Sequence, residues 1–198
     1  MANEQLKSIF LSASIPTKDR HLKYHKTADI IAIRDSVIAL ASTLLPNCRL
    51  VWGGHPSITP MIYYVMEQLK MNIQEHVTLY QSKFFEHLFP EDNNKFQNVI
   101  LTENTKEINS SLLLMRKRMF SESDFSAAIF IGGMDGIEVE YKLFKEYHPK
   151  SIVLPIASTG GASKILYEEV LPIKNRDSRL ENDYGYMSLF QDLIINKI

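Results

Sequence analysis

Short apolar runs alternate with longer amphipathic segments along this chain, and the two patterns predict strands and helices respectively. The apolar runs are too short for buried helices and predict strands over 7–13, 49–52, 77–80, 98–101, 127–131 and 151–156. Apolar residues at helical spacing predict helices over 28–45, 61–71, 104–121, 164–171 and 187–195, with one more beginning near Asp135. This alternation predicts an α/β fold, a Rossmann-like three-layer domain with a mostly parallel sheet and glycine-rich turns at the carboxyl ends of its strands.

The strongest local pattern is the glycine turn that follows the strand over 127–131. Gly132 and Gly133 stop the apolar run, and Asp135 is placed to cap the next helix. A strand, a glycine turn and a helix in this order direct backbone N–H groups toward an anion at the carboxyl edge of a sheet. The candidate ligand-binding residues of this turn are Gly132, Gly133, Asp135, Gly136 and Glu138.

Other predicted strands also end in small residues or in a glycine pair. Parallel strands joined by right-handed crossovers bring all these ends to one edge, where open α/β sheets bind ligands. A single glycine pair serves equally well as a tight turn, and the hydroxyls near the last pair serve equally well as helix caps. Three pairs at one edge favour a ligand. The further candidates are Ser12, Ser14, Gly53, Gly54, His55, Thr59, Ser158, Thr159, Gly160 and Gly161.

Composition limits the classes of function. With 198 residues and 45% apolar content, residues 1–198 are expected to form a single domain with a substantial core. The formal charge of -1 gives no basic footprint for nucleic acid. Cys48 is the only cysteine, which excludes an intrachain disulfide and suits a reducing cytoplasm. We find no apolar run long enough for a signal peptide or a membrane span, so we expect a cytoplasmic protein that binds neither nucleic acid nor membrane.

Histidines and basic residues provide two weaker candidates. His21 and His25 are spaced like metal ligands on one helix face, but no third ligand accompanies them, so we assign no metal and no cofactor. Arg116 lies near the end of the helix that precedes the glycine turn, where a guanidinium can clamp a phosphate or carboxylate. The alternative is that Arg116 and its basic neighbours only complement the dipole of the helix C-terminus.

The pair Arg116-Lys117, followed by the glycine turn and then Glu140, resembles the LOG family. Proteins of that family carry an Arg-Lys pair followed by P-G-G-x-G-T-x-x-E and hydrolyse the N-glycosidic bond of nucleoside 5′-monophosphates. The chain more closely resembles the SLOG superfamily, and within it members near bacterial TIR-linked defence systems. SLOG domains of that group are thought to sense or process nucleotide-derived ligands.

The resemblance implies roles for particular residues. Arg116 and Glu140 match the family's catalytic arginine and glutamate, and the turn that contains Gly132, Gly133 and Gly136 matches its phosphate-binding turn. The chain departs from the motif at three places: Ile131 replaces the proline, Met134-Asp135 lengthens the turn, and Ile137 replaces the threonine.

Three hypotheses follow from these patterns. The first is binding of a nucleotide-derived molecule, such as an ADP-ribose or NAD-related ligand, in anti-phage defence, with a TIR-type or other defence partner. The second is an N-glycoside hydrolase that acts on a nucleoside monophosphate or an NAD-like substrate through Glu140 and Arg116. The third is an interaction module that has lost its ligand. The resemblance also implies a homodimer or a higher homo-oligomer.

Overall fold

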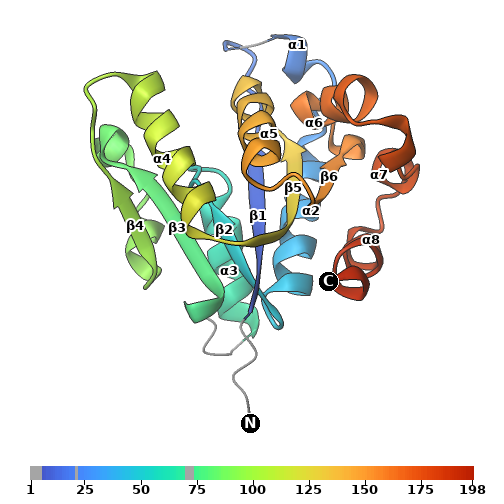
Figure 1. The fold of residues 1–198 in the computed structure, drawn as a ribbon, viewed down its shortest axis with the longest axis horizontal. Coiled ribbons are helices and arrows are strands. Elements are labelled where there is room, and N and C mark those ends of the chain that lie inside the picture. The colour runs from blue at the N-terminus through green and yellow to red at the C-terminus, as the bar shows by residue number, and fades with distance from the viewer. Residues whose placement is uncertain (1–5, 21, 70–73) are drawn as a thin grey trace.

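A computed structural model describes residues 6–20, 22–69 and 74–198 of the protein. Its centre is a six-stranded, all-parallel sheet in the order β4-β3-β2-β1-β5-β6 (Figure 1). The strands are β1 (Lys7–Ser14), β2 (Cys48–Trp52), β3 (Val77–Ser82), β4 (Val99–Thr102), β5 (Phe125–Gly132) and β6 (Ile152–Ile156). Each of the predicted strands is present, and the Rossmann-like α/β fold is confirmed.

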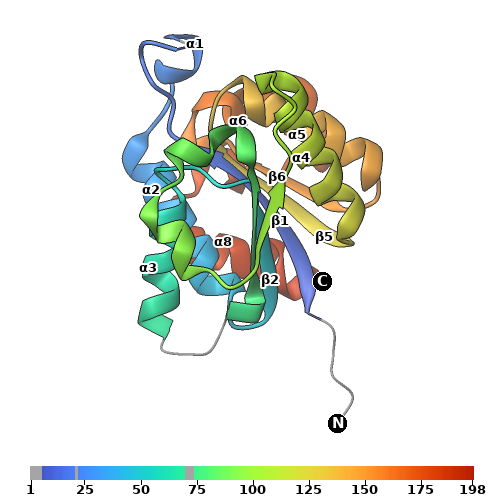
Figure 2. The ribbon, with the colours of Figure 1, turned by 90° about the vertical axis from the view of Figure 1, so that its left-hand side faces the viewer.

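Helices cover both faces of this sheet, as Figures 1 and 2 show from two directions. The helices are α1 (Leu22–His25), α2 (Ile30–Leu44), α3 (Thr59–Leu69), α4 (Ile108–Glu122), α5 (Asp135–Tyr147), α6 (Gly161–Ile165), α7 (Arg179–Asn182) and α8 (Tyr186–Leu193). A π-helical turn at Leu166–Val170 extends α6, and short 3-10 turns include Lys83–Leu88 and Glu91–Lys95. His21 and the end of the helix predicted over 61–71 lie outside the described residues.

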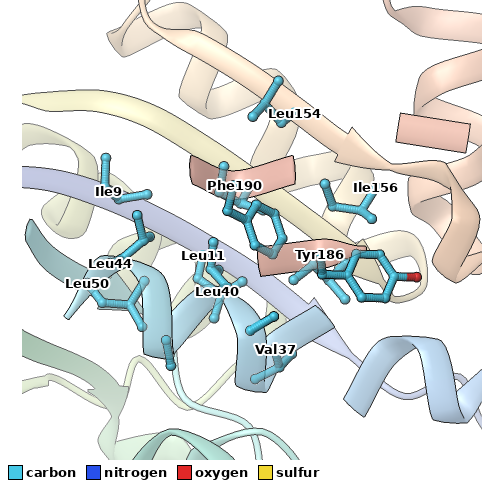
Figure 3. Packing of buried hydrophobic residues seen from close by; sticks show 14 of the residues in the cluster. Ile9, Leu11, Val37, Leu40, Leu44, Leu50, Leu154, Ile156, Tyr186 and Phe190 are labelled. Carbon is cyan, nitrogen blue, oxygen red and sulfur yellow. The ribbon is translucent and has the colours of Figure 1, made fainter. Parts of the chain in front are cut away.

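One layer of the core lies between the sheet and the helices α2, α3 and α8. Ile9 and Leu11 of β1 point to this face because side chains alternate along a strand. They pack with Leu40 and Leu44 of α2 and Phe190 of α8, all of which are fully buried or nearly so (Figure 3). These contacts fix α2 beneath β1 and β5 and thereby place the chain that enters α2 at the carboxyl edge.

The opposite layer is aromatic. Phe10, between Ile9 and Leu11, points to the face covered by α4 and α5. Its ring lies 4.8 Å from the Phe120 ring of α4 and 5.7 Å from the Phe144 ring of α5, measured between centroids. Edge-to-face and offset stacks of this kind add to the free energy gained by burial. This layer holds α4 and α5 side by side and brings residues of both to one place.

Two helices begin elsewhere than their sequence pattern indicates. The helix predicted from residue 104 begins at Ile108, because side chains in the preceding segment bind its own backbone instead. The Asn104 side chain accepts from the Lys106 N–H at 2.7 Å, and Lys106 has a φ of 70°. The helix predicted from residue 164 begins at Gly161, and the loop predicted over 175–183 contains α7.

The strand order reverses at β1. The chain builds outward from β1 through β2 and β3 to β4, and then returns to place β5 on the other side of β1. Open α/β sheets as a class bind ligands in a crevice outside the carboxyl ends of the strands at such a switch point. In Figure 1 this edge is at the top of the sheet, where α1 also lies.

Candidate functional site

An ion pair between two helices lies at the switch point. The Arg116 Nε of α4 donates to Glu140 Oε1 of α5 at 2.9 Å, and these side chains are only 12% and 15% exposed. The hydroxyl of Ser12, near the end of β1, donates to Glu140 Oε2. The fold therefore brings together the three side chains, from a central strand and from the two helices of the aromatic layer.

The lack of a side chain at Gly136 makes room for the Arg116 guanidinium. A Cβ at this position would lie 3.2 Å from Arg116 Nη2, so the absence of a side chain lets the guanidinium approach the first turn of α5. Among the described residues, Glu140 is the one partner found for the Arg116 guanidinium, which has further N–H groups. Those groups are cationic hydrogen-bond donors at the carboxyl edge of the sheet.

The turns after β5 and β6 pack against each other by direct backbone bonds. The Gly132 N–H donates to Thr159 Oγ1 at 2.8 Å, and the Ala162 N–H donates to the Gly133 carbonyl at 2.9 Å. The Thr159 side chain is fully buried and also donates to the Ile156 carbonyl. Gly161 lies so close that its Cβ would be 2.7 Å from the Gly133 carbonyl oxygen. These two predicted turns are thus joined, with their facing polar groups bound to each other.

Other predicted residues at this edge are bound within the protein. The Ser14 carbonyl accepts from the Gly133 N–H at 2.8 Å, which links the ends of β1 and β5. The Ser158 hydroxyl lies 3.1 Å from the Tyr186 hydroxyl of α8, on the opposite face from Glu140. The sequence predicts Asp135 as the N-cap of this helix. In the structure Met134 is the N-cap and Asp135 is the first residue of α5.

The segment around α1 crosses the carboxyl edge and is attached to it. The buried Tyr24 donates its hydroxyl to Glu138 at 2.7 Å, and Lys23 forms an ion pair with the same carboxylate at 3.7 Å. Burial and the Glu138 carboxylate raise the pKa of Tyr24 far above its usual value. The Thr27 hydroxyl accepts from the Gly161 N–H at 3.1 Å. Glu138, which the sequence predicts as a ligand contact, therefore attaches α1 to the first turns of α5.

The polar segment after Pro16, which includes Lys23, is longer than a minimal strand-to-helix turn, and this length predicts a binding loop. No sequence pattern singles out Tyr24 or Thr27 as part of the site. Of the two histidines considered as metal ligands, His25 lies on α1 and His21 lies outside the described residues. Within the described ranges, no group of three metal-ligating side chains is found.

The turn after β2 presents His55 in a fixed orientation. Gly54 has a φ of 70°, and its Cβ would overlap the Gln81 side chain. The His55 N–H donates to Thr59 Oγ1 at 3.3 Å, and the same hydroxyl accepts from Trp52 Nε1. The His55 ring accepts the Ser57 N–H through Nδ1 at 3.1 Å, which leaves its proton on Nε2.

Because the partly buried imidazole is desolvated and lies near the positive charge of Arg20, the pKa of His55 falls from 6.5 to about 4. As the pH falls below 6.5, His55 takes up a proton in the unfolded chain before it does so in the folded protein. The free energy of unfolding therefore decreases progressively between pH 6.5 and pH 4. The total decrease due to this residue is about 3 kcal/mol. We expect His55→Asn, whose Oδ1 can still accept the Ser57 N–H, to remove this part of the pH dependence. Urea unfolding at pH 7, 5.5 and 4.5 measures it, and parallel wild-type and variant profiles would contradict the assignment.

Fold and site together define an α/β protein of the Rossmann-like class, with polar side chains gathered at its topological switch point. The chain matches the model of the SLOG cluster3 family over residues 23–194 and belongs to that family. The resemblance to the SLOG superfamily is thereby confirmed. No curated protein matches the chain. In the ranges that the structure describes, every helix is too short or too polar to cross a membrane.

Proposed function

We propose that this protein binds a nucleotide-derived small molecule, of the ADP-ribose or NAD-related kind, in the crevice between the ends of β1 and β5. The observation that carries the proposal is the convergence of Arg116, Glu140 and Ser12 at this edge. A guanidinium suits phosphate, and a fixed carboxylate suits the hydroxyl groups of a ribose. Membership of the SLOG cluster3 family and the glycine turn before α5 support the same ligand class.

Isothermal titration calorimetry against NAD, ADP-ribose, cyclic ADP-ribose isomers and common mononucleotides tests this proposal. We expect at least one of these compounds to bind with one site per chain. The variant Lys150→Gln, in the exposed turn before β6 at the opposite edge, serves as a control that changes charge away from the crevice. If no compound of the panel binds the wild-type protein, the proposal fails.

A second candidate function is hydrolysis of an N-glycosidic bond in a nucleoside monophosphate or an NAD-like substrate. The observation that favours it is the restraint of Glu140 by partners on both carboxylate oxygens, because cleavage needs a carboxylate held beside the sugar carbon. Chromatography of reaction mixtures would detect the released base. We expect Glu140→Gln to lower turnover by about 100-fold or more. Unchanged turnover would show that Glu140 lacks this role.

The proposal also includes the cellular role of the protein and its oligomeric state. The resemblance to SLOG proteins near TIR-linked systems supports a role in anti-phage defence beside a TIR-type or other partner. The same resemblance supports a homodimer or a higher homo-oligomer in the cytoplasm. Light scattering of the purified protein and capture of partners from its own host test these two points separately.

A further inference from the structure

The segment that joins β1 to α2 passes the carboxyl edge of the sheet and carries α1. It begins after Ser14, which pairs with Gly132 at the ends of β1 and β5, and it enters α2 at Ile30. In Figures 1 and 2, α1 projects beyond this edge, above α6. The segment therefore starts beside the two central strands of the proposed site and reaches the helices that follow β5 and β6.

One end of this segment is fixed by backbone contacts. The Asp29 N–H donates to the Thr159 carbonyl at 3.2 Å, and the Gly161 N–H donates to Thr27 Oγ1 at 3.1 Å. A Cβ on Gly160 would lie 1.8 Å from the Thr27 carbonyl oxygen, so the two stretches of backbone are in close contact. The end of the segment next to α2 is therefore anchored to the turn after β6.

The α1 helix is attached to α5 by two side chains that meet one carboxylate oxygen. The Tyr24 hydroxyl donates to Glu138 Oε1 at 2.7 Å, and Lys23 Nζ lies 3.7 Å from the same oxygen. The Lys23 side chain is 61% exposed, so its ion pair contributes little. The Tyr24 ring is buried in the aromatic layer. In the described ranges, no backbone hydrogen bond joins α1 to α5, so this attachment depends mainly on the Tyr24 side chain.

Backbone bonds at one end and side-chain contacts at the other define a hinge and a latch. Segments held by few contacts open at low cost, and lids of binding sites are drawn from them. We propose that α1 (Leu22–His25) is a lid on the ligand site at the ends of β1 and β5, latched by the contact between Tyr24 and Glu138. The ligand enters and leaves when this latch opens about the anchored end at Thr27. This inference rests on the proposed function, since a lid needs a ligand to enclose.

The rates of ligand binding test this inference. Tyr24→Phe keeps the buried ring and removes only the hydroxyl that reaches Glu138. Stopped-flow measurements with ADP-ribose, or with whichever compound of the panel binds best, give the association and dissociation rates of the wild-type protein and the variant. Because loss of a hydrogen bond to a charged group favours the open lid, we expect both rates to rise about 10-fold and Kd to change less than about 3-fold.

Tyr63→Phe is the matched control for this substitution. Tyr63 donates its hydroxyl to Glu67 at 2.7 Å, which is the same chemistry and length as the bond between Tyr24 and Glu138, but both residues lie on α3. The core residues of α3 pack on the opposite face of the sheet from those of α5. We therefore expect Tyr63→Phe to keep the wild-type rates.

Opening of the lid can also be measured without a ligand. Leu22 of α1 and Lys142 of α5 are exposed, so each can carry a spin label as a cysteine variant, and the native Cys48 is buried. Double electron–electron resonance gives the distribution of distances between the two labels. We expect Tyr24→Phe to shift this distribution toward longer distances, because an unlatched α1 moves away from α5.

The outcomes separate this inference from the function beneath it. Unchanged rates in Tyr24→Phe, or faster rates with an unchanged distance between the labels, would overturn the lid while the nucleotide site stands. A rise in the dissociation rate alone would assign Tyr24 to ligand contact, and an equal rise of the rates in Tyr63→Phe would indicate a general loosening of the fold. Either result would make the inference wrong. If no compound of the panel binds the wild-type protein, the proposed function itself fails.

Discussion

Replacing Arg116 with methionine is expected to abolish ligand binding and to destabilise the fold by about 3 kcal/mol. Methionine keeps the length and the apolar stem of the side chain but removes the guanidinium. Glu140 would then remain as a largely buried carboxylate, and among the described residues the Ser12 hydroxyl is the one partner left to it. Chemical denaturation measures the stability, and calorimetry with the compound that binds best measures the affinity, which should fall at least about 100-fold.

The matched control is the double variant Arg116→Met with Glu140→Gln. Removing both charges avoids the unpaired carboxylate, so we expect this variant to recover most of the lost stability but none of the binding. The double-mutant cycle isolates the coupling between the two side chains. Additive stability losses would mean that the ion pair contributes nothing to the fold, and retained affinity in the single variant would exclude Arg116 from the site.

Replacing Gly160 with alanine is expected to cost more than about 4 kcal/mol and to prevent stable folding. Gly160 has φ 70° and ψ -154°, a region that is essentially restricted to glycine. Its Cβ would also lie 1.8 Å from the Thr27 carbonyl oxygen, which belongs to backbone and cannot rotate away. The yield of soluble protein and the denaturation midpoint measure the effect.

Gly53→Ala is the matched control for this prediction. Gly53 does not have a positive φ, and the nearest atom to its Cβ is the flexible end of Met115 at 3.1 Å. We expect a cost below about 1 kcal/mol, because that side chain can shift. A similar loss of stability in both variants would mean that close packing around these turns, and not the backbone conformation of Gly160, determines which substitutions they tolerate.

Most of the sheet could be predicted from sequence because its central strands are buried on both faces. Runs such as Ile9–Leu11 and Ala127–Ile131 are continuously apolar and too short for helices, so each pattern had one reasonable interpretation. The starts of α4 and α6 were harder to place. Local side-chain bonds at Asn104 delay α4, and contacts of Gly161 with a distant turn begin α6 early. Such contacts join residues that no local pattern relates.

Only part of the candidate site could be predicted from the sequence. The resemblance placed Arg116 and Glu140 together, and the structure joins them through an ion pair. The sequence could not indicate that Thr159 would bind the Gly132 N–H, because that bond depends on how two turns pack. Nor could it indicate Tyr24, whose place above Glu138 depends on the path of a long polar segment.

The sequence by itself determined the class of fold, the edge of the sheet that carries polar groups, and the glycine turn before Glu140. Those features follow from local hydrophobicity and from the backbone freedom of glycine, which each stretch of chain carries regardless of its surroundings. The tertiary structure alone decided which polar groups at that edge are bound by other parts of the protein. Hydrogen bonds from distant segments engage the Gly132 N–H through Thr159 and engage Glu138 through Tyr24, whereas Glu140 is the one partner found for the Arg116 guanidinium among the described residues.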